Sequence, residues 1–264
     1  MPLLDHFHPP LHGPRRWEGF HHAWATFIAA QLNRDVLPSD YFAESEISVG
    51  PELEIDVATM ELTDPRNPVG AWSGDRAPTG ATMELTDPRG EGKEIAAAAW
   101  SPPRPKFAAK VDFAHLDSYE VRVYQDLGGA ELRGAIELIS PANKDREGAR
   151  RTFAAKCAGY LRHGIGVMII DIVTARAANL HRELFDVLEV KGRPTSWKSP
   201  TDLYAVAYRA VTVRKKPRVE VWPEPLALGK PLPIMPLWLT LDLCIPVRLE
   251  ESYLETCRSL RIPA

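Results

Sequence analysis

Acidic residues inside apolar, strand-like segments are the side chains of this chain with the most potential for chemistry. Glu137 stands in AIELI and Asp56 stands in LEIDVA, while Glu46 in SEISV is a weaker candidate of the same kind. A carboxylate buried in a strand is costly unless a cation, hydrogen bonds or a bound proton compensates for it. Hard oxygen ligands suit Mg²⁺ or Mn²⁺. If the strands bring the three acids together, we expect them to be the ligands of a divalent metal ion.

A lysine follows these acids at a spacing that could bring it to the same place. Lys156 lies three residues after Phe153 and four before Tyr160 in a predicted helix, so it can share their inward face. A metal would activate water and hold a phosphate oxygen, and the ammonium would position the nucleophile and offset developing charge. The sequence therefore suggests a catalytic set of Asp56, Glu137 and Lys156.

The stretch around this lysine is locally basic. Residues 144–162 hold six Lys and Arg residues against two acids, in a chain whose net charge is −3. Such an excess could contact nucleic-acid phosphates, and a solvated helix face would explain the same charges. Composition alone favours the solvated face. The candidate nucleic-acid contacts are Lys144, Arg146, Arg150 and Arg151.

Structural roles compete with the catalytic interpretation. Asp56 could be an acid at a strand edge that meets solvent, or it could pair with a cation such as Arg133. Asp171 in MIIDIV is another acid within an apolar run, and we expect it to mark the end of a strand or to cap a turn. For Glu137, between apolar neighbours and just before a strand-ending Ser-Pro, the functional interpretation is slightly ahead.

A mixed sheet must position these residues. The stretch 130–140 predicts a strand that ends at Ser140-Pro141, and IGVMIIDIV at 165–173 predicts a strand buried on both faces. The helix between them, capped by Asp145, makes this a βαβ crossover. We therefore predict an α/β fold with a mixed central β-sheet flanked by helices. Further predicted elements are a helix at 17–33, strands at 43–49 and 52–62, a hairpin over 118–140, and strands and helices after 174.

The chain is predicted to form one domain over its 264 residues, with a surface insertion of little mechanistic weight. ATMELTDPR at 58–66 recurs at 81–89, and two copies are too few for a solenoid. The proline-rich stretch 223–246 is expected to run extended along the surface. The predicted divisions are a core at 17–62 and 106–190, the insertion at 63–105 and a β-rich C-terminal extension at 191–264.

Composition sets the remaining limits. With 45% apolar and 25% charged residues, the chain has the make-up of an ordinary globular protein. Its three cysteines form no CxxC pair, which favours reduced thiols in the cytoplasm. No signal-like start and no uncharged apolar run near the roughly 20 residues of a membrane span are found, so we expect no membrane partner. A homodimer is compatible with the sequence.

These segments carry a resemblance. EISV…LEIDVA, AIELISPANK and K…Y…HGIGVMIIDIV resemble the bacterial family called domain of unknown function 4058, over most of the chain. They are also similar to the Uma-type branch of the PD-(D/E)XK restriction-endonuclease-like superfamily. That resemblance implies a restriction-endonuclease-like core with a four-stranded mixed sheet. Where the site is intact, it also implies divalent-metal-dependent cleavage of phosphodiesters.

The resemblance assigns roles residue by residue. Asp56 and Glu137 match the motif acids, and Glu46 matches an upstream acid that sometimes assists metal binding. Ile139 replaces the usual lysine two positions after the second acid, so Lys156 is the candidate for a migrated lysine, with Lys144 as runner-up. Two hypotheses follow. One is a nuclease that uses Mg²⁺ or Mn²⁺, and the other is a noncatalytic binding or scaffold protein that keeps the fold.

Overall fold

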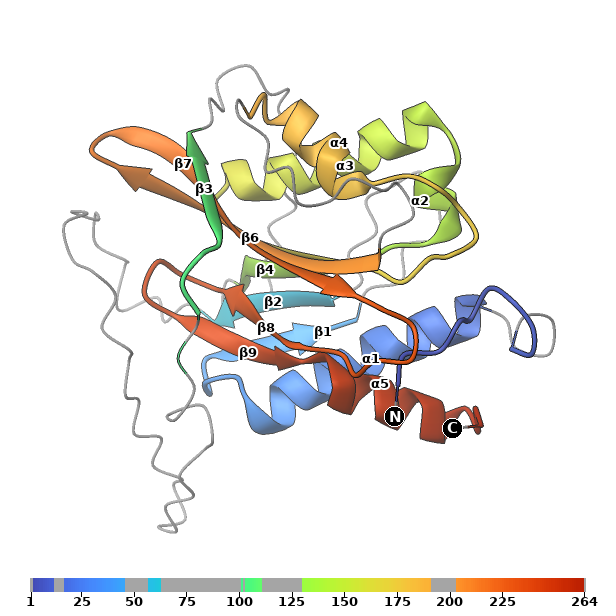
Figure 1. Ribbon diagram of the computed structural model, residues 1–264. Coiled ribbons are helices and arrows are strands. Elements are labelled where there is room, and N and C mark those ends of the chain that lie inside the picture. The colour runs from blue at the N-terminus through green and yellow to red at the C-terminus, as the bar shows by residue number, and fades with distance from the viewer. Residues whose placement is uncertain are drawn as a thin grey trace, which may run out of the picture.

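A mixed sheet with helices on both faces forms the centre of the computed structural model, and seven of its strands lie in the described residues (Figure 1). The strand order is β1-β2-β4-β5-β6-β7-β3. This confirms the predicted α/β class. The described residues are 2–11, 17–45, 57–62, 101, 103–110, 130–190 and 203–263. The strands of this sheet are β1 (Tyr41–Glu44), β2 (Val57–Leu62), β3 (Phe107–Lys110), β4 (Ala130–Leu138), β5 (Gly166–Asp171), β6 (Leu203–Val213) and β7 (Lys216–Leu226).

Helices and a second, two-stranded sheet complete the layers. Helices α3 and α4 cover one face of the central sheet, and α1, α5 and the β8–β9 hairpin cover the other (Figure 1). No helix within the described ranges is long and apolar enough to cross a membrane. The bounds are α1 (Trp17–Asp35), α2 (Pro141–Asp145), α3 (Glu147–Arg162), α4 (Leu180–Val187), α5 (Leu249–Ser259), β8 (Ile234–Trp238) and β9 (Cys244–Arg248).

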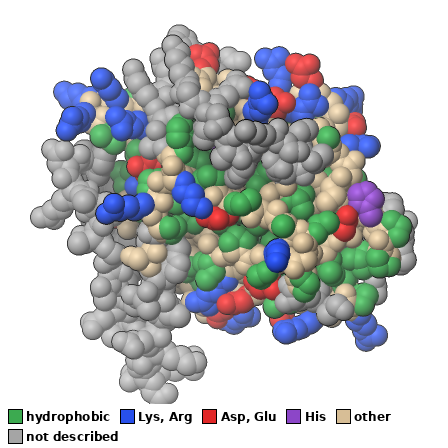
Figure 2. Space-filling model, in the orientation of Figure 1, with side chains coloured by type: hydrophobic (Ala, Val, Ile, Leu, Met, Phe, Trp, Pro, Cys, Tyr) green, Lys and Arg blue, Asp and Glu red, His purple; other side chains and the backbone are tan. Residues whose placement is uncertain are grey.

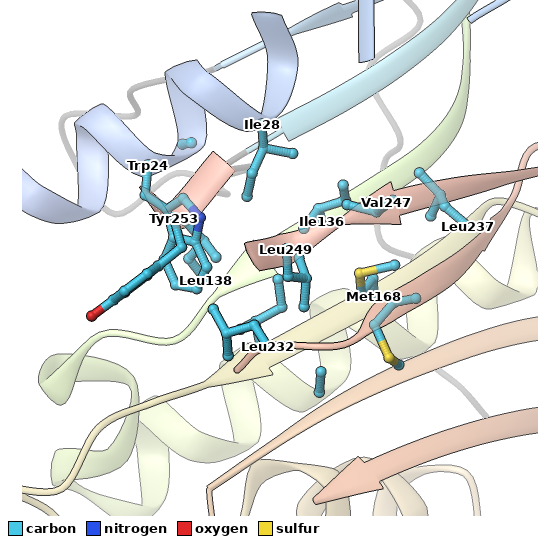
Figure 3. Close-up of a cluster of buried hydrophobic side chains, with 14 of the residues drawn as sticks. Trp24, Ile28, Ile136, Leu138, Met168, Leu232, Leu237, Val247, Leu249 and Tyr253 are labelled. Carbon is cyan, nitrogen blue, oxygen red and sulfur yellow. The ribbon is translucent and has the colours of Figure 1, made fainter. Parts of the chain in front are cut away.

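The predicted crossover is confirmed, because β4 and β5 pair in parallel and α2 and α3 connect them. The strands alternate between two hydrophobic clusters. Ile136 and Leu138 of β4 face the cluster under α1 and α5 (Figure 3), while Ala135 faces the cluster under α3 and α4. All six residues of β5 are buried, as expected of a strand covered on both faces. The alternation of β4 places Glu137 on the α3 side of the sheet.

The C-terminal half differs from its predicted arrangement. Strands β6 and β7 belong to the central sheet, with β6 antiparallel to β5. They are therefore part of the core and not a separate C-terminal extension. The physical reason is backbone hydrogen bonding. A fully buried strand such as β5 needs a partner on each edge, and β4 supplies only one of the two.

The prediction for the proline-rich stretch 223–246 was also wrong. Pro223 lies inside β7, and β8 and β9 form a hairpin packed on the sheet, with Met235, Leu237 and Val247 fully buried. A two-stranded ribbon consists of edge strands, where a missing proline N–H is tolerated. The apolar residues between the prolines therefore decide the burial of this stretch.

Local signals at the crossover were partly misassigned. Ser140, which follows the end of β4 as predicted, is the N-cap of the short helix α2 and forms a capping box with Asn143. Asp145 is not the cap of α3, because the N-cap residue is Arg146, which makes no side-chain capping bond. Gly164, with φ of 78°, ends the helix, whereas Gly166 already begins β5.

Several predicted features fall outside the described residues. They include most of the insertion 63–105, the second repeat copy at 81–89 and the hairpin turn near 128. Of the first repeat copy, residues 58–62 belong to β2.

The exposed edge of β1 is covered by a side chain of α1. The amide of Asn33 donates from Nδ2 to the carbonyl of Ala43 at 2.8 Å and accepts from the N–H of Ala43 at 2.7 Å. Because β1 is the last strand on its side of the sheet, these bonds occupy groups that would otherwise face solvent.

Candidate active site

A buried ion pair joins β4 to α3. The ammonium Nζ of Lys156 donates to Oε2 of Glu137 at 2.8 Å, and the two side chains are 9% and 2% exposed. This confirms the predicted inward phase of Lys156 and its approach to Glu137. A carboxylate that would be costly alone at this depth is thus compensated by a cation.

The local sequence explains how the two side chains meet. The strand ends just after Glu137, and the short helix α2 turns the chain so that α3 crosses the same face of the sheet. On α3, Phe153, Cys157 and Tyr160 form a buried stripe, and Lys156 lies within its arc. The ring of Phe153 lies 5.6 Å from Nζ, which adds a cation–π contact.

Ile139 occupies the place where the resemblance expects a lysine. It is buried among the residues under α3 and α4, and its N–H donates to the carbonyl of Ile170. The ammonium next to Glu137 therefore comes from the helix and not from the strand.

A second buried ion pair lies on the same side of the sheet. Nζ of Lys144 donates to Oδ2 of Asp171 at 2.8 Å, and both side chains are 0% exposed. Lys144 was predicted to contact nucleic acid, and its complete burial contradicts that prediction. The residue belongs to α2, which follows β4 closely and directs the side chain inward.

Asp171 also has the role that its sequence position indicated. It is the last residue of β5, and its Oδ1 accepts from the N–H of Val173 at 3.0 Å, so it caps the turn after the strand. Burial raises the pKa of Asp171, and the charge and hydrogen bond of Lys144 oppose that rise. Burial thus has the largest influence on the pKa of this acid, and Lys144 has the largest influence in the opposite direction.

The polar contacts continue across β6 and α4. The hydroxyl of Tyr204 accepts from the N–H groups of Leu180 and His181, at 3.0 and 3.3 Å. Nδ1 of His181 lies 2.5 Å from the hydroxyl of Tyr208. Burial lowers the pKa of His181 to about 3 and raises the pKa of Tyr208 well above its ordinary value. Both side chains are therefore neutral at neutral pH.

Sequence reasoning did not single out His181, Tyr204 or Tyr208. One signal was present in the strand LYAVAY, where Tyr204 and Tyr208 are four residues apart and must point to the same face. Nothing in the sequence indicated that α4 would bring an imidazole to that face.

Asp56 and Glu46, the other proposed metal ligands, lie outside the described residues. Val57, which follows Asp56 in the sequence, pairs with Ile136, which precedes Glu137. Within the part of the chain that the structure describes, no group of three His, Cys, Asp or Glu residues could hold a metal ion. Of the proposed triad, the described residues therefore include Glu137 and Lys156. Arg133, the alternative partner proposed for Asp56, donates to Glu131 at 2.6 Å.

The remaining predicted nucleic-acid contacts are paired on the surface. Arg150 lies 3.0 Å from Glu183, and Arg146 lies 3.9 Å from Asp145. Arg151 lies 3.8 Å from Glu147, one turn away. Lys144 and Lys156 are paired in the interior, so this segment presents fewer cations at the surface than its sequence suggests.

The chain matches no family model, and it has no significant match among curated proteins or solved structures. The resemblance to the restriction-endonuclease-like superfamily thus stays a prediction that rests on the residues quoted for it.

Proposed function

We propose that the protein is a metal-dependent nuclease that hydrolyses phosphodiesters with Asp56, Glu137 and Lys156. The buried contact between Lys156 and Glu137 carries the proposal, because it joins an acid and an ammonium from separate elements at the end of a central strand. A metal ion held by Glu137, with Asp56 and Glu46, would supply Lewis acidity toward the phosphate. Lys156 would orient the carboxylate of Glu137 and offset charge that develops on the phosphate.

Energetics support a use beyond folding. A buried ion pair is often no more stabilising than an apolar pair of the same volume. An apolar residue at position 137 would also continue the pattern of AIELI without the cost of a buried charge. The neighbouring strands β1, β2, β4 and β5 form a mixed four-stranded group within the larger sheet, which is compatible with the four-stranded mixed sheet that the resemblance implies.

The test compares two ion pairs of the same molecule. Thermal melting with and without Mg²⁺ or Mn²⁺ is measured for wild type, Glu137→Gln and Lys156→Met, together with cleavage of plasmid DNA and of RNA. We expect a metal-dependent rise in melting temperature that is lost in Glu137→Gln, and cleavage that falls by at least about 100-fold in both variants.

The matched control is Lys144→Met, which removes the ammonium of the other buried pair. It should lower stability and leave cleavage per folded molecule within a few-fold of wild type. Metal-independent melting of wild type together with no cleavage of either substrate would reject the nuclease.

A noncatalytic binding or scaffold protein is the second candidate. The observation that favours it is closure of the site, since Glu137 is almost fully buried and Ile139 replaces the usual lysine. This candidate predicts no response to either metal. For both candidates we propose a cytoplasmic location, which the free thiols of Cys157, Cys244 and Cys257 suit. Homodimer formation stays a prediction.

A further inference from the structure

The hairpin of β6 and β7 extends past the strands beside it. Strand β5 pairs with β6 only over 204–208, and β3 pairs with β7 only over 218–221. The ladder between β6 and β7 continues to the pair Val213 and Lys216. Among the described residues, the outer part of this hairpin is thus a ribbon two strands wide, and Figure 1 shows it reaching beyond the body of the protein.

The end of this ribbon carries a dense positive charge. Arg214, Lys215, Lys216 and Arg218 are all exposed, and they make up all but one of the residues 214–218. In the described part of the chain, none of the four forms a salt bridge with an acid, in contrast to the arginines of α3. Lys and Arg side chains gather at the tip of the ribbon in Figure 2. The charge of these four residues is therefore not neutralised by an acid in the described part of the chain.

The turn is also costly for the backbone. Arg214 and Lys215 have φ angles of 50° and 63°, the left-handed region that two-residue hairpin turns require and that Asn-Gly normally supplies. Side chains of like charge at neighbouring positions add repulsion. Both features disfavour folding, so they point to a role for the charges outside the fold.

A cleft of about 570 Å³ adjoins the base of the ribbon. Exposed Arg162 and His163, from the end of α3, line it together with Arg209 of β6. The guanidinium of Arg209 lies 3.7 Å from the ring centroid of Trp238, which also lines the cleft, and it pairs with Glu220 at 2.6 Å. The cleft therefore places further cationic side chains next to the basic tip.

We infer that the β6–β7 ribbon binds the backbone of duplex DNA. A two-stranded ribbon fits the major groove of B-form DNA, whereas the deep, narrow major groove of RNA helices does not admit it. Residues 209–218 contain no aromatic side chain, so the ribbon lacks the stacking platforms of single-strand binders. Val213 is the one exposed large apolar residue of this described stretch, too few for insertion into a membrane.

This binding surface is separate from the ion pair of Glu137 and does not depend on turnover. The test is fluorescence anisotropy of the full chain with a labelled DNA duplex of about 25 base pairs, titrated at several salt concentrations. Arg214→Asn/Lys215→Gly removes two cations and places the preferred residues in the turn. We expect the slope of log K against log salt to become less negative by about 2, and the affinity at 0.1 M salt to fall on the order of 50-fold.

The control variant Lys230→Asn/Arg258→Asn removes the same charge from two exposed positions outside the ribbon, and it should bind within about twofold of wild type. The titration contains no divalent metal ion, so its outcome does not depend on cleavage. Equal loss of affinity in both double variants would overturn the inference, because net charge alone would then explain binding. Tighter binding to single strands, to duplex RNA or to anionic vesicles of phosphatidylserine would overturn it as well.

Discussion

The lysines of α2 and α3 and the cations of the β6–β7 ribbon both lie in basic stretches of the sequence. In the structure the two lysines are buried, whereas the ribbon cations are exposed. Lys144 and Lys156 each lie inside the protein against one carboxylate. The ribbon residues Arg214 and Lys215 are exposed, without an acidic partner among the described side chains. A run of positive charge in a sequence therefore says little about function until the direction of each side chain is known.

The direction of these side chains follows from the layer around each element. Helix α3 packs on the sheet, so one side of it must be buried, and Lys156 falls on that side. Among the described residues, no layer covers the tip of the ribbon, where the side chains of residues 212–216 are exposed. Each buried charge therefore depends on its partner inside the protein, whereas exposed charges are available for a partner outside it.

The largest expected effect is on the free energy of unfolding when the buried ion pair of Lys144 and Asp171 is broken. Lys144→Ala leaves the carboxylate of Asp171 buried without its cation and should lower the free energy of unfolding by about 3–5 kcal/mol. Lys144→Met/Asp171→Leu removes both charges and should recover most of that loss. Urea denaturation monitored by circular dichroism measures both. A cost below about 1 kcal/mol for the single variant would show that the pair is not structural.

An intermediate effect is expected from pH, through the buried histidine of the same layer. The pKa of His181 is lowered from 6.5 to about 3 by burial, so the unfolded chain takes up a proton between these values and the folded chain does not. The stability that neutral His181 allows is complete above pH 6.5 and is lost as the pH falls toward 3. The slope approaches about 1.4 kcal/mol per pH unit.

The measurement is the free energy of unfolding of wild type and of His181→Gln between about pH 7 and 4.5. In the variant, the slope of the free energy of unfolding against pH should be smaller, by an amount that corresponds to the uptake of nearly one proton. The difference between the two proteins isolates His181, because the raised pKa of Asp171 acts with the opposite sign and is common to both. His6, whose pKa burial lowers to about 4, cancels in the same way. Parallel slopes would mean that His181 accepts a proton in the folded protein.

The smallest effect, with the opposite sign, is expected at the ribbon. Arg214→Asn/Lys215→Gly relieves two left-handed backbone positions and should raise the free energy of unfolding by about 1 kcal/mol. The exposed pair Arg146→Asn/Arg151→Asn should change it by less than about 0.5 kcal/mol. Thermal melting of the three proteins decides the point. A destabilised ribbon variant would indicate that the turn contributes to folding and would weaken the comparison.

The sequence predicted the central crossover well because its signals are strong and local. IGVMIIDIV is too apolar for any place except a sheet interior, and Ser140-Pro141 stops the preceding strand. Helical spacing alone placed Lys156 on the inward side of α3. The contact between Lys156 and Glu137 could therefore be anticipated from two periodicities.

The remaining features depend on contacts between distant segments. No local signal shows that β6 fills the second edge of β5, since that pairing joins residues more than thirty positions apart. Lys144 is buried because α2 is short and turns inward, which its composition does not reveal. The turn at Arg214 lacks glycine, so the tip of the ribbon gives no turn signal of the usual kind.

The amide of Asn33 has a consequence for how copies of this protein meet. By occupying both peptide groups of Ala43, it leaves an incoming strand no donor or acceptor at that position of β1. A second molecule could extend the sheet there only by breaking both bonds, so this edge resists the strand-by-strand growth that leads to fibrils.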